Sequence, residues 1–276
     1  MHSAHAPIQS ADAFLSFANR HSLVSFANAT AVAWIETVRG VPNVWAATAS
    51  STARPTRLTN FTDEDVELTR LQPAGGGLVF GYAPIAGTNP LHRTPHGRAA
   101  ATWLVGLGVP PTLVANESLV GTSPVGDVLV IRPSGSGQAL YEIPVFGGTE
   151  RLLFEVKQGT LGSFAWRPDG GVLAFANARG SHGFLGLYAR NLSRITWVAP
   201  SVDTDTEPSW SRDGGRLAWL RLSTPAGDAG FSPTDGDDGN RGPDYQVLLA
   251  DVSFGATLRV GPTITAFADH TYGLAS

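Results

Sequence analysis

The sequence predicts an all-β protein: a β-propeller of about five to six four-stranded blades, with an incomplete ring and one short N-terminal helix. Three observations lead to this prediction. A short turn phrase recurs along the chain, and apolar runs of strand length follow each copy. Glycine and proline are abundant, while charged residues are scarce. Together these features favour many short strands joined by tight turns over long, solvated helices.

Composition sets the first limits on function. The chain has 276 residues, of which 42% are hydrophobic and 15% charged, and this length is sufficient for a large core. The net charge is −4 and Lys157 is the one lysine, so no basic surface for nucleic acid or for an anionic membrane is expected. The chain has no cysteine, which excludes disulfides and thiolate metal sites.

The recurring phrase places glycine just before a strand-like run. Five copies align on this turn: "FANATAVAW" (26–34, degenerate), "QPAGGGLVF" (72–80), "SPVGDVLVI" (123–131), "RPDGGVLAF" (167–175) and "SRDGGRLAW" (211–219). Their spacings are 46, 51, 44 and 44 residues. A repeat of this length is typical of propellers and solenoids.

Each repeat predicts the same antiparallel strands. Proline presets φ at an early turn position and glycine tolerates a positive φ, so the phrase predicts a tight turn. The run that follows, such as 172–175, is apolar on both alternations, which indicates a strand covered on both faces. Two further apolar segments follow in each copy. The gaps between them are too short for the helical crossovers of a parallel α/β fold.

The elements are expected in a simple order along the chain. The segment 1–19 precedes the blades, and the one helix is predicted at Ala11 to Arg20. The blades are predicted at 20–62, 63–116, 117–158, 159–202 and 203–263, and a partial sixth blade at 264–276. Two polar insertions, 83–100 and 222–244, are predicted to be loops at equivalent places in the second and fifth blades.

Longer phrases make the pattern more specific. The segments "RGVPNVW" (39–45), "RGSHGFLGLY" (179–188) and "PSVDTDTEPSWSRDG" (200–214) resemble the N-terminal propeller of the prolyl oligopeptidase family of serine peptidases, in its dipeptidyl-peptidase and acylaminoacyl-peptidase branch. TolB-like propellers share the same blade pattern. The resemblance extends from about Ala11 to Arg221. It implies a propeller that limits access to an active site and docks peptide substrates.

The catalytic machinery of that family is not expected in this chain. Its members carry Ser, Asp and His on a separate hydrolase domain, with the serine in a G-x-S-x-G turn. The sequence contains no G-x-S-x-G, and no Glu-Glu pair that could hold a substrate's amino terminus. We therefore expect no catalytic, cofactor-binding or metal-binding residues, and no enzymatic activity without a hydrolase domain, which this chain is expected to lack. One alternative is a stand-alone TolB-like protein-binding propeller, and another is a hydrolase assembled on the propeller itself.

Two groups of residues resemble metal ligands but are interpreted as loops. His92 and His96 have the spacing of a zinc pair, yet Pro95 between them prevents a regular helix and no third ligand is evident. The acidic stretch "DGDDGN" (235–240) lacks the sixth-position glycine and the closing glutamate of a calcium loop.

A polar turn between two predicted strands is the remaining candidate for a site. Arg179 and His182 in "RGSHG" are interpreted as pairing with Asp203 or Asp205 to join adjacent blades, with ligand contact as the alternative. Six tryptophans at equivalent strand positions are expected to fill the core: Trp34, Trp45, Trp166, Trp197, Trp210 and Trp219.

The expected partner is a peptide or protein substrate, reached through an associated hydrolase domain. Open strand edges of an incomplete ring would also favour self-association. The sequence shows no signal peptide and no apolar run long enough to span a membrane, which favours a cytoplasmic location.

Overall fold

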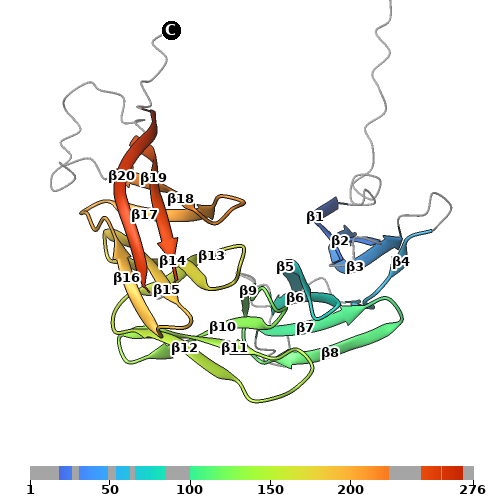
Figure 1. Ribbon diagram of the computed structural model, residues 1–276. Helices are drawn as coiled ribbons and strands as arrows, with labels where there is room; N and C mark the ends of the chain where they lie inside the picture. The colour runs from blue at the N-terminus through green and yellow to red at the C-terminus, as the bar shows by residue number, and fades with distance from the viewer. Residues whose placement is uncertain are drawn as a thin grey trace, which may run out of the picture. The chain divides into compact units, whose positions relative to one another are not determined.

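All secondary structure in the described part of the chain is β-strand (Figure 1). The structure is a computed structural model and describes residues 19–26, 31–48, 54–62, 66–84, 100–223, 244–255 and 257–269. The strands are β1 (Asn19–Ser25), β2 (Ala31–Val38), β3 (Val41–Thr48), β4 (Thr56–Arg57), β5 (Val66–Ala74), β6 (Gly77–Pro84), β7 (Ala101–Gly106), β8 (Val109–Ala115), β9 (Leu119–Thr122), β10 (Val128–Ser134), β11 (Gly137–Ile143), β12 (Arg151–Val156), β13 (Thr160–Trp166), β14 (Val172–Arg179), β15 (His182–Ala189), β16 (Arg194–Val198), β17 (Thr204–Trp210), β18 (Arg216–Ser223), β19 (Asp244–Phe254) and β20 (Leu258–Asp269). The all-β class predicted from the sequence is confirmed.

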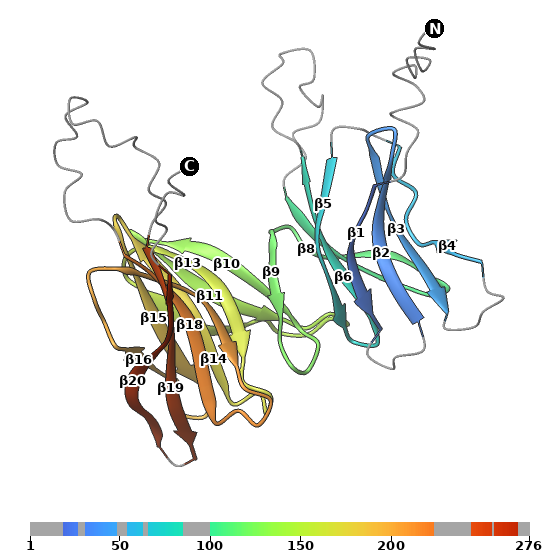
Figure 2. The same cartoon turned by 90° about the horizontal axis from the view of Figure 1, so that it is seen from above.

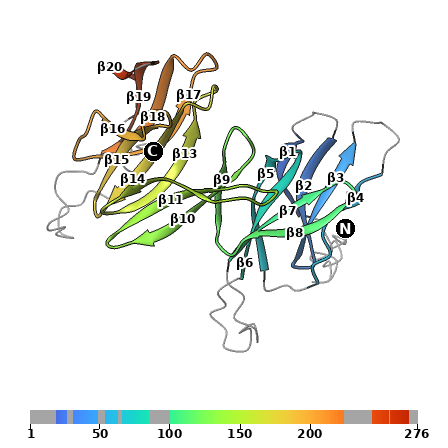
Figure 3. The same ribbon diagram turned by 60° about the horizontal axis from the view of Figure 1, so that its bottom comes forward.

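The strands form blades in successive groups of four along the chain. The sheets β1–β4, β5–β8 and β9–β12 each run in chain order. The strands β13–β16 and β17–β20 repeat this order, and a parallel pair between Gly183 and Thr204 joins them into one eight-stranded sheet. In Figure 3, β13, β14 and β15 lie next to one another within this sheet. The described residues therefore contain five four-stranded propeller blades.

The recurring phrase forms the turn between the first two strands of a blade. In the fourth blade the Arg167 N–H donates to the Val172 carbonyl at 2.8 Å, and the Gly170 N–H donates to the Arg167 carbonyl at 2.8 Å. Gly170 has a φ of 72°, which glycine adopts without steric cost. The Asp169 carboxylate accepts the Gly171 N–H at 3.0 Å, which fixes the turn from within. The sequence phrase thus encodes a specific hairpin.

The first strand of a blade also carries a bulge that the repeat did not predict. In the first, second, fourth and fifth blades, Ser22, Arg70, Ser163 and Glu207 adopt a positive φ of 49–57° where the register with the second strand shifts. A non-glycine residue in this region stores about 1 kcal/mol or more of backbone strain. The bulges of the fourth and fifth blades contact each other, because the Ser163 hydroxyl donates to the Glu207 carboxylate at 3.1 Å.

The chain divides into two compact units, 1–130 with 142–150 and 131–141 with 151–276. In the first unit, the sheets β1–β4 and β5–β8 lie against each other (Figure 2). Buried apolar side chains pack between them. Ile35, Leu68 and Phe80 are among the fully buried ones, and burial of each contributes about 1.5–3 kcal/mol. Buried Asn43 fastens the connection after β4, since its side chain bonds the Thr59 hydroxyl at 2.9 Å and the backbone of Phe61.

In the second unit, each face of the fourth blade has its own neighbours. Val172, Leu185 and Leu187 lie on one face and pack with Leu217 and other buried residues of the fifth blade. The opposite face of β14 presents Leu173, Phe175, Asn177 and Arg179, because side chains alternate along a strand. The Phe175 ring stacks on that of Phe154 from β12, with centroids 4.5 Å apart. This second face carries the candidate site described below.

Several expectations lie partly or wholly outside the described residues. The predicted helix at Ala11 to Arg20 does so except for Asn19 and Arg20, which begin β1. Most of the insertions 83–100 and 222–244 also lies outside them. Residues 264–269, assigned to a partial sixth blade, instead continue β20, because they pair with β19. The incomplete ring stays a prediction, because it depends on how the two units are placed.

Candidate binding site

The metal-like motifs do not contribute to a described site. His92, His96 and residues 235–240 lie outside the described residues. Within the ranges that the structure describes, no group of three or more His, Asp or Glu side chains could hold a metal ion. No helix in those ranges is long and apolar enough to cross a membrane.

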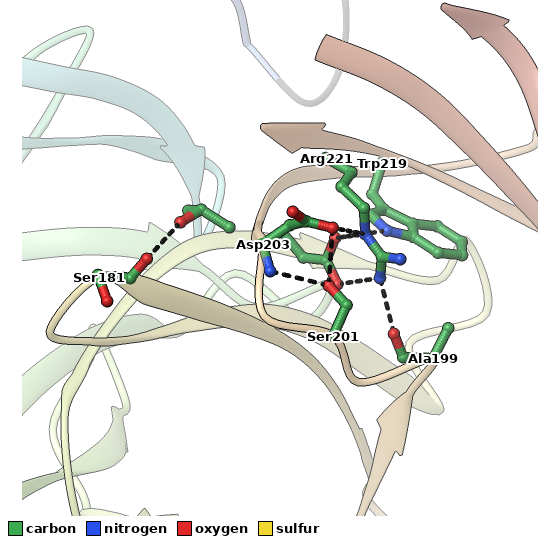
Figure 4. Close-up of polar contacts among 8 residues, drawn as sticks. Ser181, Ala199, Ser201, Asp203, Trp219 and Arg221 are labelled. Atoms are coloured by element: carbon green, nitrogen blue, oxygen red, sulfur yellow. Dashed lines mark hydrogen bonds and ion pairs between the residues drawn. The ribbon is translucent and has the colours of Figure 1, made fainter. Parts of the chain in front are cut away.

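A buried polar network in the fifth blade includes Arg221 and Trp219 (Figure 4), and both side chains donate to Asp205 at its centre. The Asp205 side chain is 0% exposed and accepts two hydrogen bonds from the Arg221 guanidinium, at 2.7 and 2.8 Å. The indole N–H of Trp219 donates to the same carboxylate at 3.2 Å. Arg221 also donates to the Ala199 carbonyl at 2.7 Å. The hydrogen bond to Asp205 raises the pKa of Arg221 above its ordinary value.

The connection between the fourth and fifth blades is fixed mainly by backbone groups. The Gly183 N–H donates to the Asp203 carbonyl at 3.1 Å. The Ser181 carbonyl (Figure 4) accepts a hydrogen bond from the Thr204 hydroxyl at 3.5 Å. Ser201 bonds the Asp203 carboxylate at 3.2 Å. The blades are therefore joined where the sequence suggested, but by different groups.

The predicted pairing of Arg179 and His182 with Asp203 or Asp205 is wrong. Among the described residues, neither side chain forms a hydrogen bond or ion pair with either aspartate. The reason is that Arg221 occupies the Asp205 carboxylate from the same blade. Arg179 points elsewhere.

Arg179 lies between two aromatic rings, on the face of β14 that points away from the fifth blade. Its guanidinium carbon is 5.3 Å from the ring centroid of Phe184 and 5.4 Å from that of Trp197, within the range of a cation–π contact. The Arg179 Nε atom is buried and has no hydrogen-bond partner in the described structure. The aromatic rings therefore hold the guanidinium in place without neutralising it.

A hollow of about 580 Å³ lies within the second unit, between strands of the third and the fourth blade of the chain. Arg179 and Trp197 are among the residues that line it. The other lining residues are Ser136, Glu155, Val156, Lys157, Gln158 and Ile195. The wall is held by local bonds, because Ser136 donates to the Lys157 carbonyl at 3.0 Å. The Ser134 hydroxyl likewise donates to the Glu155 carboxylate at 2.8 Å. We call this hollow the Arg179 pocket.

The net charge of the residues that line the Arg179 pocket is positive, whereas the net charge of the whole chain is negative. Arg179 and Lys157 contribute two positive charges and Glu155 one negative charge, whereas the chain has a net charge of −4. Trp197 is 36% exposed and offers an apolar ring at the rim. The expectation that all six tryptophans fill the core is therefore wrong for Trp197, although Trp219 is fully buried.

The described residues show two contacts between a serine and a histidine. His21 Nδ1 lies 3.1 Å from Ser22 Oγ, and His182 Nδ1 lies 3.4 Å from Ser181 Oγ. Both pairs are sequence neighbours on the surface, and no described carboxylate bonds either imidazole. A triad would need that third group to orient the base.

A second hollow, of about 290 Å³, lies in the first unit and is mainly apolar. It is lined by Phe26, Gly75, Gly76, Gly77, Leu104, Val105, Gly106, Leu107, Val109 and Phe146. Its rim includes Phe146, which is 76% exposed. None of these lining residues carries a charged side chain.

Sequence reasoning found Arg179 but missed the rest of the pocket. Lys157, Glu155 and Gln158 lie in an ordinary strand and turn, and nothing in their spacing marks a site. One signal was available in the aligned repeats. Asn177 aligns with Arg221, and Leu161 with Asp205, so the fourth blade lacks the ion pair of the fifth.

Several solved structures share the fold of this chain. No known family profile matches the chain, and no curated protein sequence matches it. Among solved structures, a putative TolB from Agrobacterium tumefaciens is 17% identical with a TM-score of 0.51, over 92% of this chain and 82% of that chain. A prolyl endopeptidase structure is 12% identical with a TM-score of 0.59, over 89% of this chain and 35% of that chain.

A third structure, oligogalacturonate lyase from Vibrio parahaemolyticus, is 10% identical with a TM-score of 0.52, over 89% of this chain and 64% of that chain. The chain thus spans less than two thirds of the length of the lyase and of the endopeptidase. At these identities the likeness establishes architecture only. The chain has the β-propeller blade fold that it shares with TolB and with part of a prolyl endopeptidase.

Proposed function

We propose that this chain is the non-catalytic propeller portion of a prolyl-oligopeptidase-like serine peptidase. In this role it admits and docks peptide substrates for a hydrolase domain that carries the catalytic Ser, Asp and His. The chain itself contributes binding and access control rather than bond cleavage.

One observation carries the proposal. The chain aligns over 89% of its own length with a prolyl endopeptidase structure, but over only 35% of that chain, at a TM-score of 0.59. A match of this kind is expected when one domain of a larger peptidase is compared with the whole. The absence of any G-x-S-x-G in these residues agrees with a division of labour between domains.

A second candidate is a stand-alone TolB-like propeller that binds another protein. It is favoured by the match to the putative TolB structure, of which the chain covers 82% rather than about a third. Under this candidate the blades are the whole functional unit and no hydrolase domain is needed.

The two candidates are separated by the reading frame that encodes these residues and by an activity probe. The first predicts that the complete frame encodes a G-x-S-x-G hydrolase domain and that its product reacts with a fluorophosphonate probe. The 276-residue chain alone should remain unlabelled. A complete frame without such a domain would favour the TolB-like candidate. Labelling of the 276-residue chain itself would contradict both.

A further inference from the structure

We infer that the Arg179 pocket binds a carboxylate group carried by a peptide. The inference deepens the proposed docking role and rests on it, since the peptide is the molecule that the chain is proposed to dock. The groups concerned are the guanidinium of Arg179, the ammonium of Lys157 and the exposed ring of Trp197.

Arg179 carries a positive charge that no described carboxylate pairs with. An arginine stays protonated, so a partly buried guanidinium keeps its charge, and buried charges in proteins are normally paired. Arg221 on the neighbouring blade follows this rule through Asp205, at 2.7 and 2.8 Å. Among the described residues Arg179 contacts the rings of Phe184 and Trp197 but forms no ion pair, and its Nε atom is buried without an acceptor. A carboxylate is the group whose geometry complements a guanidinium.

The lining of the Arg179 pocket has a positive net charge. Lys157 adds a second cation, and no described residue pairs with its ammonium group. Glu155 adds one anion, which is held by Ser134. The balance is one net positive charge, which suits a singly charged carboxylate.

Asn177, a buried residue beside the pocket, provides an independent observation. It is 0% exposed, and both polar atoms of its side chain have no hydrogen-bond partner in the described structure. Asn177 and Arg179 lie on the same face of β14, and the backbone of Gly159 lies against both. Gly159 directly follows Gln158 of the pocket wall. Buried Asn43 in the first unit, by contrast, bonds the Thr59 hydroxyl and the backbone of Phe61.

The rim of the pocket offers an aromatic ring. The half-exposed ring of Trp197 can cover the apolar part of a peptide residue whose carboxylate meets Arg179. The cavity volume of about 580 Å³ is in the range of ordinary ligand sites. The pocket therefore offers charge recognition and apolar contact together, as a peptide end or an acidic side chain requires.

The test uses the whole chain and matched peptides. One N-acetylated tetrapeptide carries a free C-terminal carboxylate, and its control is the same peptide as an amide. A second pair, both amidated, differs only in one Glu or Gln side chain. Affinities are measured by titration calorimetry at low salt. We expect the carboxylate form of at least one pair to bind about tenfold more tightly than its neutral control.

Variants locate this preference. Arg179→Gln should abolish the difference between charged and neutral peptides. Arg194→Gln, an exposed arginine on the same strand as Trp197, should leave it unchanged. Lys157→Gln removes an exposed side chain without disturbing a buried one, so it tests the site even if Arg179→Gln fails to fold. We expect it to reduce the preference about threefold.

Failure of the inference can be told apart from failure of the docking role. Equal binding of charged and neutral peptides, unaffected by Arg179→Gln and Lys157→Gln, would overturn the carboxylate site and leave docking intact. The indole N–H resonance of Trp197 is therefore also followed during addition of sodium acetate at constant ionic strength. A shift that Lys157→Gln weakens, with no peptide bound, would support the anion site and contradict peptide docking. No response to either probe would overturn both.

Discussion

The fourth and fifth blades use the same backbone positions for opposite purposes. In the fifth blade the cross-strand neighbours Asp205 and Arg221 form a buried ion pair. The same register in the fourth blade pairs Leu161 with Asn177, whose amide has no hydrogen-bond partner among the described residues. One blade thus satisfies its polar groups internally, while the other leaves polar groups and a charge beside a pocket.

The neighbouring positions follow the same division. Trp219 donates to Asp205, whereas its counterpart Phe175 has no polar group and stacks on Phe154 instead. Asp203 in the fifth blade corresponds to Gly159 in the fourth. The comparison teaches that a repeat specifies a backbone, while side chains at one register decide between internal stability and binding.

The largest effect is expected at Arg221. Arg221→Leu leaves the buried Asp205 carboxylate without its cation, although Trp219 still donates to it, and should lower the free energy of unfolding by about 3–5 kcal/mol. Urea denaturation followed by tryptophan fluorescence measures the change. Arg216→Leu, at an exposed site on the same strand, is the control and should change stability by about 0.5 kcal/mol or less. A loss below about 1 kcal/mol at Arg221 would mean that the ion pair does not distinguish the blades.

Gly159 is expected to give the next largest effect. It has a φ of 89°, and an added Cβ would lie 2.6 Å from the Asn177 side-chain oxygen and closer still to the Ala178 carbonyl. Gly159→Ala should therefore cost about 2–3 kcal/mol in unfolding free energy, from clash and backbone strain together. Gly147→Ala is the matched control, because its φ is 85° and nothing lies within 4 Å. Equal losses at the two glycines would show that close packing around Asn177 contributes nothing.

Asn177 in the fourth blade aligns with Arg221, and its replacement by leucine should stabilise the fold, whereas Arg221→Leu should destabilise it. Asn177→Leu removes an unpaired buried amide and should raise the free energy of unfolding by about 1–2 kcal/mol. The same denaturation experiment measures it, with Asn191→Leu at an exposed turn as the control. A clear loss of stability would contradict the absence of a partner for this amide.

The smallest effect concerns the turn of the fifth blade. The Ser211 hydroxyl at 2.6 Å and the Gly215 N–H at 2.9 Å lower the pKa of Asp213 below its ordinary value of 3.8. A lowered carboxyl pKa stabilises the fold above the unfolded value, and this contribution is lost as pH falls below about 4. The stability difference between wild type and Ser211→Ala should therefore shrink between pH 5 and pH 3 in thermal unfolding. A constant difference would assign the effect to the Arg216 backbone bond alone.

Much of the fold could be predicted because it is repeated locally. The phrase that ends in Asp169 and Gly170 encodes a turn whose bonds lie within a few residues, so sequence spacing alone located it. The bulges at Ser163 and Glu207 were missed, because a serine and a glutamate at positive φ have no common sequence signature. Non-glycine residues accept that strain only in their tertiary setting.

The candidate site was predictable only in part. Arg179 was identified from its turn, but its assigned partners were wrong, since Arg221 lies in register with Asp205 and claims its carboxylate. Trp197 was expected in the core, although β16 is the outer strand of its sheet and leaves the ring half exposed. Lys157 joined the pocket through a neighbouring blade, which spacing along the chain cannot indicate.

Hydrogen exchange with and without the free-carboxylate peptide tests most directly whether the fourth blade, rather than the fifth, serves binding. At saturating peptide we expect slower amide exchange around 155–158, 179–184 and 195–197, and no change around Arg221 in β18. Slower exchange confined to β17 and β18, or none near Arg179 when peptide is bound, would contradict the account.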